Sequence, residues 1–223
     1  MKKGCILCLL ISVISLPLIA QNIIYSNLKE LLTQHGDTTA VLRVEKRSRN
    51  QIVLTGGADY RITAGDDESM CRRLKKRCFA VRDEKGNLYL NCRKLRYKKL
   101  RFGAWYAPAV QLGKNIYFCA MPLGSVIGGN FVEEDDVKLG GNIGDALAAS
   151  SLVTKRVCYE LNGETGKVDF LGKDRMLQLL KNYPELKQAY LKDDSQEAKH
   201  TFKYLLESVS YTHLRAHETT LHL

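Results

Sequence analysis

The sequence predicts an α+β fold, in which a mainly antiparallel β-sheet follows an N-terminal helix and precedes a small C-terminal helical unit. Three observations support this class. Apolar residues recur at helical spacing early in the chain, alternate with polar residues over most of positions 39–121, and return to helical spacing after position 173. With 223 residues, the chain is long enough to bury a core without disulfide or metal staples.

The N-terminal helix is predicted from a capping signal. Asn27 is followed three residues later by Glu30, the pattern in which two side chains satisfy the first backbone N–H groups of a helix. Leu28 and Leu31 then recur at helical spacing. Gly36 is expected to end this helix, because glycine adopts the left-handed backbone conformation without strain.

The central region is predicted to consist of strands and one short basic helix. The helix is expected at 70–77, and the strands at 39–45, 51–55, 58–63, 78–83, 87–93, 96–102, 105–112 and 115–121. Pro108 indicates that its strand lies at a sheet edge or is interrupted, because proline cannot donate to a hydrogen-bond ladder.

The later part of the chain is predicted to form a hairpin around the sequence ELNGETG, followed by three helices. Asp174 is expected to cap the first helix, and Pro184 suits the first turn of the second. Together with the two chain ends, this gives five segments: a signal peptide (1–20), a helix plus β-rich region (21–121), a glycine-rich loop with a short helix (122–153), a hairpin plus helical unit (154–208) and a non-native tail (209–223).

The first residues have the pattern of a cleaved secretory signal. Lys2 and Lys3 precede an apolar run from Gly4 to Leu16, and Ala20 lies at the expected cleavage site. The run is short for a membrane span, and an uncleaved anchor is the alternative. We therefore expect a periplasmic, outer-envelope or secreted protein, with no transmembrane span after signal cleavage.

Residues 209–223 contain a stretch, Ser210 to Thr219, that resembles the translation of a sequencing adapter. We therefore leave this segment out of the fold prediction and assign no metal site to its histidines. The natural sequence after Ser208 is then expected to differ from this tail.

Two cysteines are predicted to face each other across a hairpin. If residues 84–86 form a three-residue loop, Ala80 meets Leu90 and Cys78 meets Cys92, on a non-hydrogen-bonded pair whose Cα atoms approach closely. In an oxidising compartment this pair is expected to form a disulfide, although free thiols are the alternative. The pairing of Cys71, Cys119 and Cys158 is left open.

The positive charge of the chain, +10 in total, is concentrated between residues 72 and 101. Export argues against a nucleic-acid partner, so an anionic glycan, a lipid head group or an acidic protein is expected. A solvated sheet face that discourages aggregation is the alternative interpretation. The candidate binding residues are Arg93, Lys94, Arg96, Tyr97, Lys98, Lys99, Arg101 and Trp105.

Motifs for common enzyme classes are missing from the sequence. It contains no phosphate-binding loop, dinucleotide fingerprint or nucleophile elbow, and only His35 and His200 lie between residues 21 and 208. We therefore assign no catalytic residue and expect no cofactor and no metal. The remaining enzymatic alternative is a secreted hydrolase that uses carboxylates such as Asp59 or Asp66.

Three stretches carry a resemblance to a known class of proteins: LKELLTQHGDT, NQIVLTGGADYRI and GKVDFLGKDRMLQLLKNYPELKQAYLK. Together with Ala20-Gln21, they resemble a family of uncharacterised secreted or periplasmic proteins from Bacteroides-type Gram-negative gut bacteria. The resemblance implies a cell-envelope location and assigns no activity or site residue. The sequence thus predicts an exported cell-envelope protein, a non-enzymatic binding or structural module whose basic β surface contacts an anionic partner.

Overall fold

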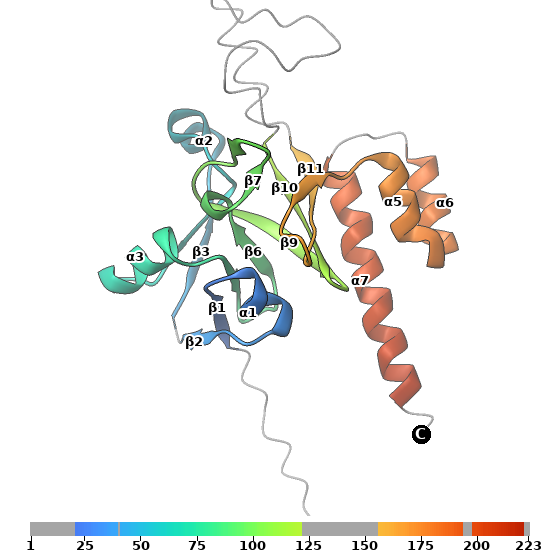
Figure 1. The fold of residues 1–223 in the computed structure, drawn as a ribbon, viewed down its shortest axis with the longest axis horizontal. Helices are drawn as coiled ribbons and strands as arrows, with labels where there is room; N and C mark the ends of the chain where they lie inside the picture. Colours follow the sequence, from blue (N-terminus) through green and yellow to red (C-terminus); the bar gives the residue numbers. More distant parts are fainter. Residues whose placement is uncertain (1–20, 40, 122–155, 194–197, 221–223) are drawn as a thin grey trace, which may run out of the picture.

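The computed structural model describes residues 21–39, 41–121, 156–193 and 198–220 (Figure 1). It confirms the predicted α+β class, with an antiparallel sheet, an N-terminal helix and a C-terminal helical unit. The predicted signal peptide and the glycine-rich segment 122–153 lie outside the described residues.

The strands in chain order are β1 (Asn22–Tyr25), β2 (Asp37–Thr39), β3 (Arg43–Lys46), β4 (Tyr60–Thr63), β5 (Ala80–Arg82), β6 (Leu88–Asn91), β7 (Arg96–Tyr97), β8 (Leu100–Arg101), β9 (Tyr106–Leu112), β10 (Asn115–Ala120), β11 (Val157–Leu161) and β12 (Val168–Phe170). The helices are α1 (Leu28–Thr33), α2 (Arg49–Thr55), α3 (Glu68–Lys76), α5 (Lys173–Leu179), α6 (Pro184–Lys192) and α7 (Ala198–Thr220), with 3-10 turns η1 (Cys92–Lys94) and η2 (Leu180–Asn182).

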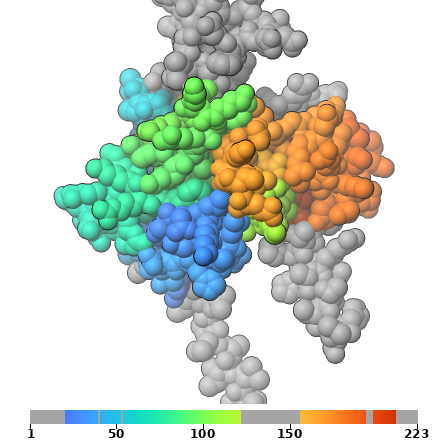
Figure 2. All heavy atoms as spheres, viewed as in Figure 1, coloured from blue at the N-terminus to red at the C-terminus, as the bar shows by residue number. Residues whose placement is uncertain are grey.

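The main sheet is antiparallel throughout and has the strand order β12-β11-β10-β9-β6-β5-β1-β2. A side branch, β3–β4, joins it where Tyr60 pairs with Tyr106 of β9. The C-terminal helices lie on one side of the sheet, and α3 lies on the other side of the molecule in Figures 1 and 2. Helix α7 contacts β9, β10 and β11.

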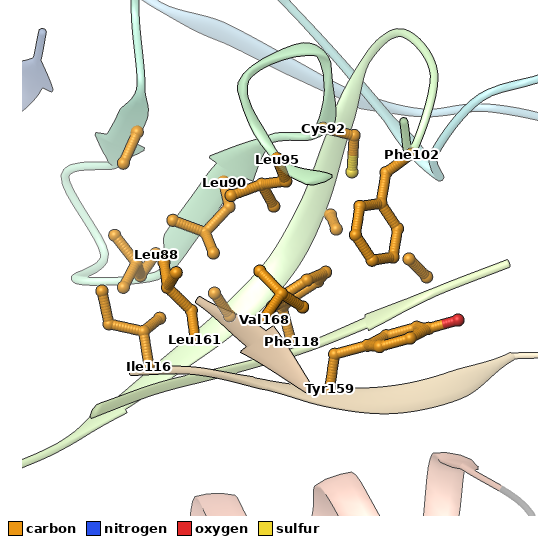
Figure 3. Close-up of a cluster of buried hydrophobic side chains, with 14 of the residues drawn as sticks. Leu88, Leu90, Cys92, Leu95, Phe102, Ile116, Phe118, Tyr159, Leu161 and Val168 are labelled. Atoms are coloured by element: carbon orange, nitrogen blue, oxygen red, sulfur yellow. The ribbon is translucent and has the colours of Figure 1, made fainter. Parts of the chain in front are cut away.

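The buried side chains form three clusters. The largest fills one face of the sheet, and Figure 3 shows its labelled members, among them Cys92, Phe102, Phe118 and Tyr159. A second cluster lies beneath the C-terminal helices and a third beneath α3 and β3–β4. Strand side chains alternate between the two faces of a sheet. The one main sheet therefore contributes side chains to all three apolar clusters.

Helix α1 begins as predicted but ends differently. The Asn27 side chain accepts a hydrogen bond from the Glu30 backbone N–H at 2.9 Å. The predicted left-handed end at Gly36 is wrong, because Gln34 takes that conformation with φ of 55°. Gly36 instead packs against β1, where an added Cβ would lie 2.7 Å from the Ile24 carbonyl oxygen.

The strand predicted at 51–55 is wrong, because residues 49–55 form helix α2. The Ser48 hydroxyl accepts from the Gln51 backbone N–H, and the Gln51 side chain accepts from the Ser48 backbone N–H. This capping box fixes the first turn, whereas the β-branched residues that follow favour a strand by composition. The cap outweighs that composition here.

Pro108 does not mark an edge or a break, since β9 lies inside the sheet between β6 and β10. The Cys92 N–H donates to the Trp105 carbonyl, so alternation makes the Tyr89–Pro108 pair of β6–β9 non-hydrogen-bonded. The missing N–H therefore points toward β10, whose ladder with β9 begins only at Ala109. Proline is accommodated because this position requires no donor.

The C-terminal unit follows the prediction in its main features. The hairpin β11–β12 precedes three helices, and Pro184 occupies the first turn of α6. Gly172, not Asp174, is the N-cap of α5, and Asp174 lies within its first turn. Helix α7 continues to Thr220, into the segment interpreted from sequence as a non-native tail.

Candidate functional site

The basic residues between 93 and 101 lie on the outer surface of a small hairpin. Strands β7 and β8 form their own two-stranded sheet, in which Arg96 lies directly opposite Arg101. Like charges at such positions repel each other. Figure 2 shows this part of the chain, in green, at the molecular surface. Six basic side chains are exposed here: Arg93, Lys94, Arg96, Lys98, Lys99 and Arg101.

These six cations are not neutralised by acidic neighbours within the described ranges. No ion pair forms between any of them and a carboxylate in residues 21–39, 41–121, 156–193 or 198–220. The Lys98 ammonium makes a cation–π contact with Tyr97, 5.2 Å from the centre of the ring. The surface therefore presents uncompensated positive charge to solvent.

The two aromatic residues expected at this surface have different positions. Tyr97 packs inward against Phe170 of β12, with ring centres 4.8 Å apart. Trp105 lies away from the hairpin, in a surface cleft formed by β3, β4 and α3. Sequence reasoning grouped both residues with the basic run, whereas the structure assigns only Trp105 to a cleft.

The Trp105 cleft has a volume of about 360 Å³ and is open to solvent. Arg43 and Glu45 of β3 line it, together with Arg61 of β4 and Lys75 of α3. A small extension of about 30 Å³ is lined by Lys75, Trp105 and Arg93. The cleft thus gathers four exposed cations and one carboxylate around a partly buried indole ring.

Cation–π contacts stabilise the indole ring of Trp105. The Arg47 guanidinium lies 5.1 Å from the ring centre and that of Arg61 lies 5.8 Å from it. In such contacts the cation is attracted by the negative face of the aromatic ring, which stabilises both groups in this position. The partly buried ring thus lies among positive charges in the wall of the cleft.

The backbone of Trp105 is strained, with φ of 74° in a bulky residue. Gly57 lies against this turn, where an added Cβ would lie 2.5 Å from the carbonyl oxygen of Ala104. Gly57, the second glycine of the sequence TGGADYRIT, therefore permits a close approach of two backbones. Strain that the surrounding structure maintains is characteristic of functional sites.

Arg47 supports the cleft from beneath. Its guanidinium donates to the carbonyl oxygens of Gly56 and Ala58 at 2.8 and 2.7 Å, and to Gln51 at 2.9 Å. Burial lowers the pKa of Arg47 from its ordinary value, and the nearby Asp59 carboxylate opposes that change. These contacts tie α2 to the segment that precedes β4.

The carboxylates proposed for the hydrolase alternative are placed differently. Asp59 accepts hydrogen bonds from the Arg156 Nε at 3.0 Å and forms an ion pair with its guanidinium. Asp66 is exposed in the loop before α3. Asp59 thus acts as an anchor for Arg156, which gives no support to its use as an acid or base. In the part of the chain that the structure describes, no three His, Cys, Asp or Glu side chains cluster as metal ligands would.

The structure does not show the predicted disulfide between Cys78 and Cys92: both are buried and, like the other cysteines of the described residues, are free thiols. The predicted hairpin register is confirmed, since Ala80 pairs with Leu90. However, β6 ends at Asn91 and Cys92 begins the turn η1. Cys92 still lies in the largest cluster, with Leu88 and Leu90, whereas the Cys78 N–H donates to the Arg73 carbonyl of α3 and the Cys78 side chain lies in the cluster beneath α3.

A second hollow, of about 660 Å³, lies between α7 and strands β6 and β9. Its walls include Tyr89, Pro108, Phe202 and Leu206, with Arg82 at one side. Its apolar lining contrasts with the charged lining of the Trp105 cleft. The basic cleft has the more specific chemistry, so it is the stronger candidate site.

Sequence reasoning missed Arg43 and Arg61 as site residues. They lie on β3 and β4, far along the chain from Trp105, and no local motif connects them to it. Their strand positions share one face, because Arg43 pairs with Thr63 and Glu45 pairs with Arg61. Only the junction of β4 with β9 places this face beside Trp105.

Within the ranges that the structure describes, no helix combines the length and the apolar character needed to cross a membrane. No curated protein and no solved structure matches the chain. One family model does match, over residues 23–211, which is most of the sequence. The chain therefore belongs to DUF6563, a family of unknown function.

Proposed function

We propose that this protein is an exported, non-enzymatic module of the cell envelope that binds an anionic glycan at the Trp105 cleft. The observation that carries the proposal is the convergence of Arg43, Arg61, Lys75 and Arg93 around one strained tryptophan. The location rests on the N-terminal signal pattern alone.

The chemistry of the cleft favours a sugar acid or a sulfated sugar. One face of a pyranose ring is lined with C–H bonds and packs on an indole ring, while arginine binds carboxylate and sulfate groups with two parallel hydrogen bonds. A volume of about 360 Å³ lies in the size range of small-ligand sites. A lipid head group or an acidic protein would use the charge but would not require the tryptophan.

The turn η1 connects the edge of the cleft to the basic hairpin. Arg93 lines the edge of the cleft, and Lys94 and Arg96 follow it along η1 and β7. A polymer with repeated negative charges could contact the cleft and the hairpin together. The six exposed cations would then raise its association rate in a salt-dependent manner.

The test measures binding of the full chain to immobilised polygalacturonate and chondroitin sulfate, with dextran as a neutral polymer and phosphatidylglycerol vesicles as an anionic lipid. We expect binding to both acidic glycans at about 20 mM salt and much weaker binding at about 500 mM salt. Retention of dextran, binding that salt leaves unchanged, or vesicle binding that exceeds glycan binding would contradict the proposal.

Two double variants with equal charge loss locate the site. Arg61→Gln/Lys75→Gln should weaken glycan binding by about tenfold, because two charge-assisted contacts are lost. Lys181→Gln/Lys192→Gln, in the helical unit on the opposite side of the molecule (Figure 1), should leave binding unchanged. Equal losses in both variants would indicate a nonspecific effect of net charge and would reject the cleft.

A further inference from the structure

Two cysteines outside the candidate site lie directly opposite each other in the main sheet. Cys119 of β10 pairs with Cys158 of β11. Their sulfur atoms are 2.7 Å apart, and both side chains are buried. The chain between them is long, 39 positions, so no local sequence pattern indicates this contact.

The hydrogen bonds of β11 show which kind of pair this is. The Leu171 N–H donates to the Cys158 carbonyl at 2.9 Å, so the polar backbone groups of Cys158 point toward β12. In an antiparallel strand both backbone groups of a residue point to the same side. The pair formed by Cys158 and Cys119 is therefore the non-hydrogen-bonded type, whose Cα separation of about 4.5 Å falls within the range of disulfides.

The two sulfurs are enclosed on the side of the sheet that the C-terminal helices cover. Cys119 and Cys158 both donate to the carbonyl oxygen of Ala198, the first residue of α7, at 3.8 and 3.3 Å. The sulfur–sulfur contact with Cys158 and burial both raise the pKa of the Cys119 thiol well above its ordinary value. The nucleophilic thiolate of Cys119 is therefore suppressed once α7 is in place.

We propose that Cys119 and Cys158 form a cross-strand disulfide in the mature protein. This inference is independent of the glycan proposal. It requires an oxidant, which we take to be a disulfide-carrying thiol oxidoreductase or, in the test tube, oxidised glutathione.

The reaction is two successive thiol–disulfide exchanges. One cysteine thiolate attacks a sulfur of the oxidant, which forms a mixed disulfide and releases one thiolate. The second cysteine thiolate then attacks the sulfur of its partner, which closes the Cys119–Cys158 bond and releases the second thiolate. Two electrons pass to the oxidant, and the two cysteine protons end on its two thiols.

Because burial suppresses the thiolate, the bond is expected to form during folding, before α7 covers the strands. Once formed, it joins β10 to β11 across the segment between them. The small movement required, from 2.7 Å to a bond of about 2.05 Å, needs only a side-chain adjustment. The backbone register already provides the geometry.

The test refolds the reduced full chain in a mixture of reduced and oxidised glutathione. Free thiols are then blocked with N-ethylmaleimide, and peptides from a non-reducing digest are identified by mass spectrometry. We expect a linked peptide pair containing Cys119 and Cys158 that disappears on reduction. Recovery of both cysteines as maleimide adducts, or of either one linked mainly to another cysteine, would overturn the proposal.

A second measurement compares melting temperatures of the oxidised protein with and without reductant. We expect reductant to lower the melting temperature by about 10 °C in the unaltered chain and in Cys78→Ala/Cys92→Ala. It should have no effect on Cys119→Ala/Cys158→Ala. If reductant leaves the unaltered chain unchanged, the bond is absent and the proposal fails.

Discussion

Two pairs of cysteines lie near antiparallel ladders in this molecule, and only one pair brings its sulfurs together. The register of β5 and β6, if continued outward, would place Cys78 opposite Cys92. That ladder ends before it reaches them. Cys92 stays in the same cluster as Leu88 and Leu90, whereas Cys78 follows α3 and lies in a different apolar cluster. Cys119 and Cys158 lie inside a ladder that continues on both sides of them.

The difference shows what a correct register can and cannot determine. A register fixes which residues face each other only as far as both strands remain extended. Beyond the last pair, local hydrogen bonds decide where each side chain points. Three experiments can therefore compare the surroundings of the two cysteine pairs. They measure the coupling free energy within each pair, the stability that Asn91 provides near Cys78, and the pH dependence of stability near Cys158.

The largest difference is expected in double-mutant cycles on the oxidised protein. The coupling free energy between Cys119→Ala and Cys158→Ala should be about 4 kcal/mol, because either substitution opens the same closed loop of 39 positions. The coupling between Cys78→Ala and Cys92→Ala should be within about 0.5 kcal/mol of zero, since each thiol packs separately. Urea unfolding of the four variants and the two doubles measures both values, and equal couplings would refute the distinction.

A smaller effect is expected at Asn91, the residue at which the β5–β6 ladder ends. Its buried side chain donates to the carbonyl oxygens of Leu74 and Cys78 at 3.1 and 2.9 Å and accepts from the Arg93 N–H. Asn91→Ala should lower the free energy of unfolding by about 2 kcal/mol, because the Cys78 carbonyl loses the Asn91 donor and the Leu74 carbonyl keeps only its hydrogen bond from the Tyr106 hydroxyl.

Two readouts check this prediction. Chemical denaturation should show the loss for Asn91→Ala and almost none for the matched variant Asn182→Ala, whose side chain is exposed. Alkylation of the Cys78 thiol should also become faster in Asn91→Ala, because the hydrogen bonds from Asn91 to the carbonyl oxygens of Leu74 and Cys78 are lost. Unchanged Cys78 reactivity together with unchanged stability would show that Asn91 does not hold this end of the hairpin.

The smallest effect concerns Glu160, two pairs along the ladder from Cys158. Hydrogen bonds from Arg175, at 2.8 Å, hold the pKa of Glu160 below its ordinary value, and burial partly opposes them. A carboxyl group whose pKa is lower in the folded state than in the unfolded state stabilises the fold at pH values above its unfolded-state pKa, which is near 4.5 for Glu160. This stabilisation is lost as the pH falls through the folded-state pKa. Acidification below about pH 4.5 should therefore reduce the contribution of this pair.

Arg175→Gln provides the measurement for that prediction. At pH 7 it should cost about 1–2 kcal/mol, and the difference from the unaltered chain should shrink as the pH approaches 3. Lys114→Gln, which removes an exposed ion pair with Glu164, should have no measurable effect at either pH. A constant cost of Arg175→Gln at all pH values would show that the Glu160 charge is not involved.

Local signals explain what the sequence could predict. The pairing of Ala80 with Leu90 follows from a turn whose glycine, Gly86, has φ of 83° as expected. Residues 51–55 favour a strand by their β-branched composition, whereas the capping box of Ser48 and Gln51 starts helix α2. Pro108 was misinterpreted because the hydrogen-bonding side of a strand depends on its neighbours, which the local sequence does not reveal.

The candidate site was predictable only in part, for the same reason. The run from Arg93 to Arg101 indicated an exposed basic surface, and the structure exposes its charged residues. The Trp105 cleft instead requires β3, β4 and α3 to meet, and these contacts join segments far apart in the chain. Only tertiary pairing brings Arg43 and Arg61 to this tryptophan.

The facing arginines of the small hairpin have a thermodynamic consequence. Arg96 and Arg101 repel each other in the unliganded molecule, so the inward packing of Tyr97 must hold β7 and β8 together. A polyanion placed between the two guanidinium groups would remove this repulsion and favour the folded state over the unfolded one. Heat resistance of the protein would then increase with polyanion concentration, which offers a label-free titration of the proposed ligand.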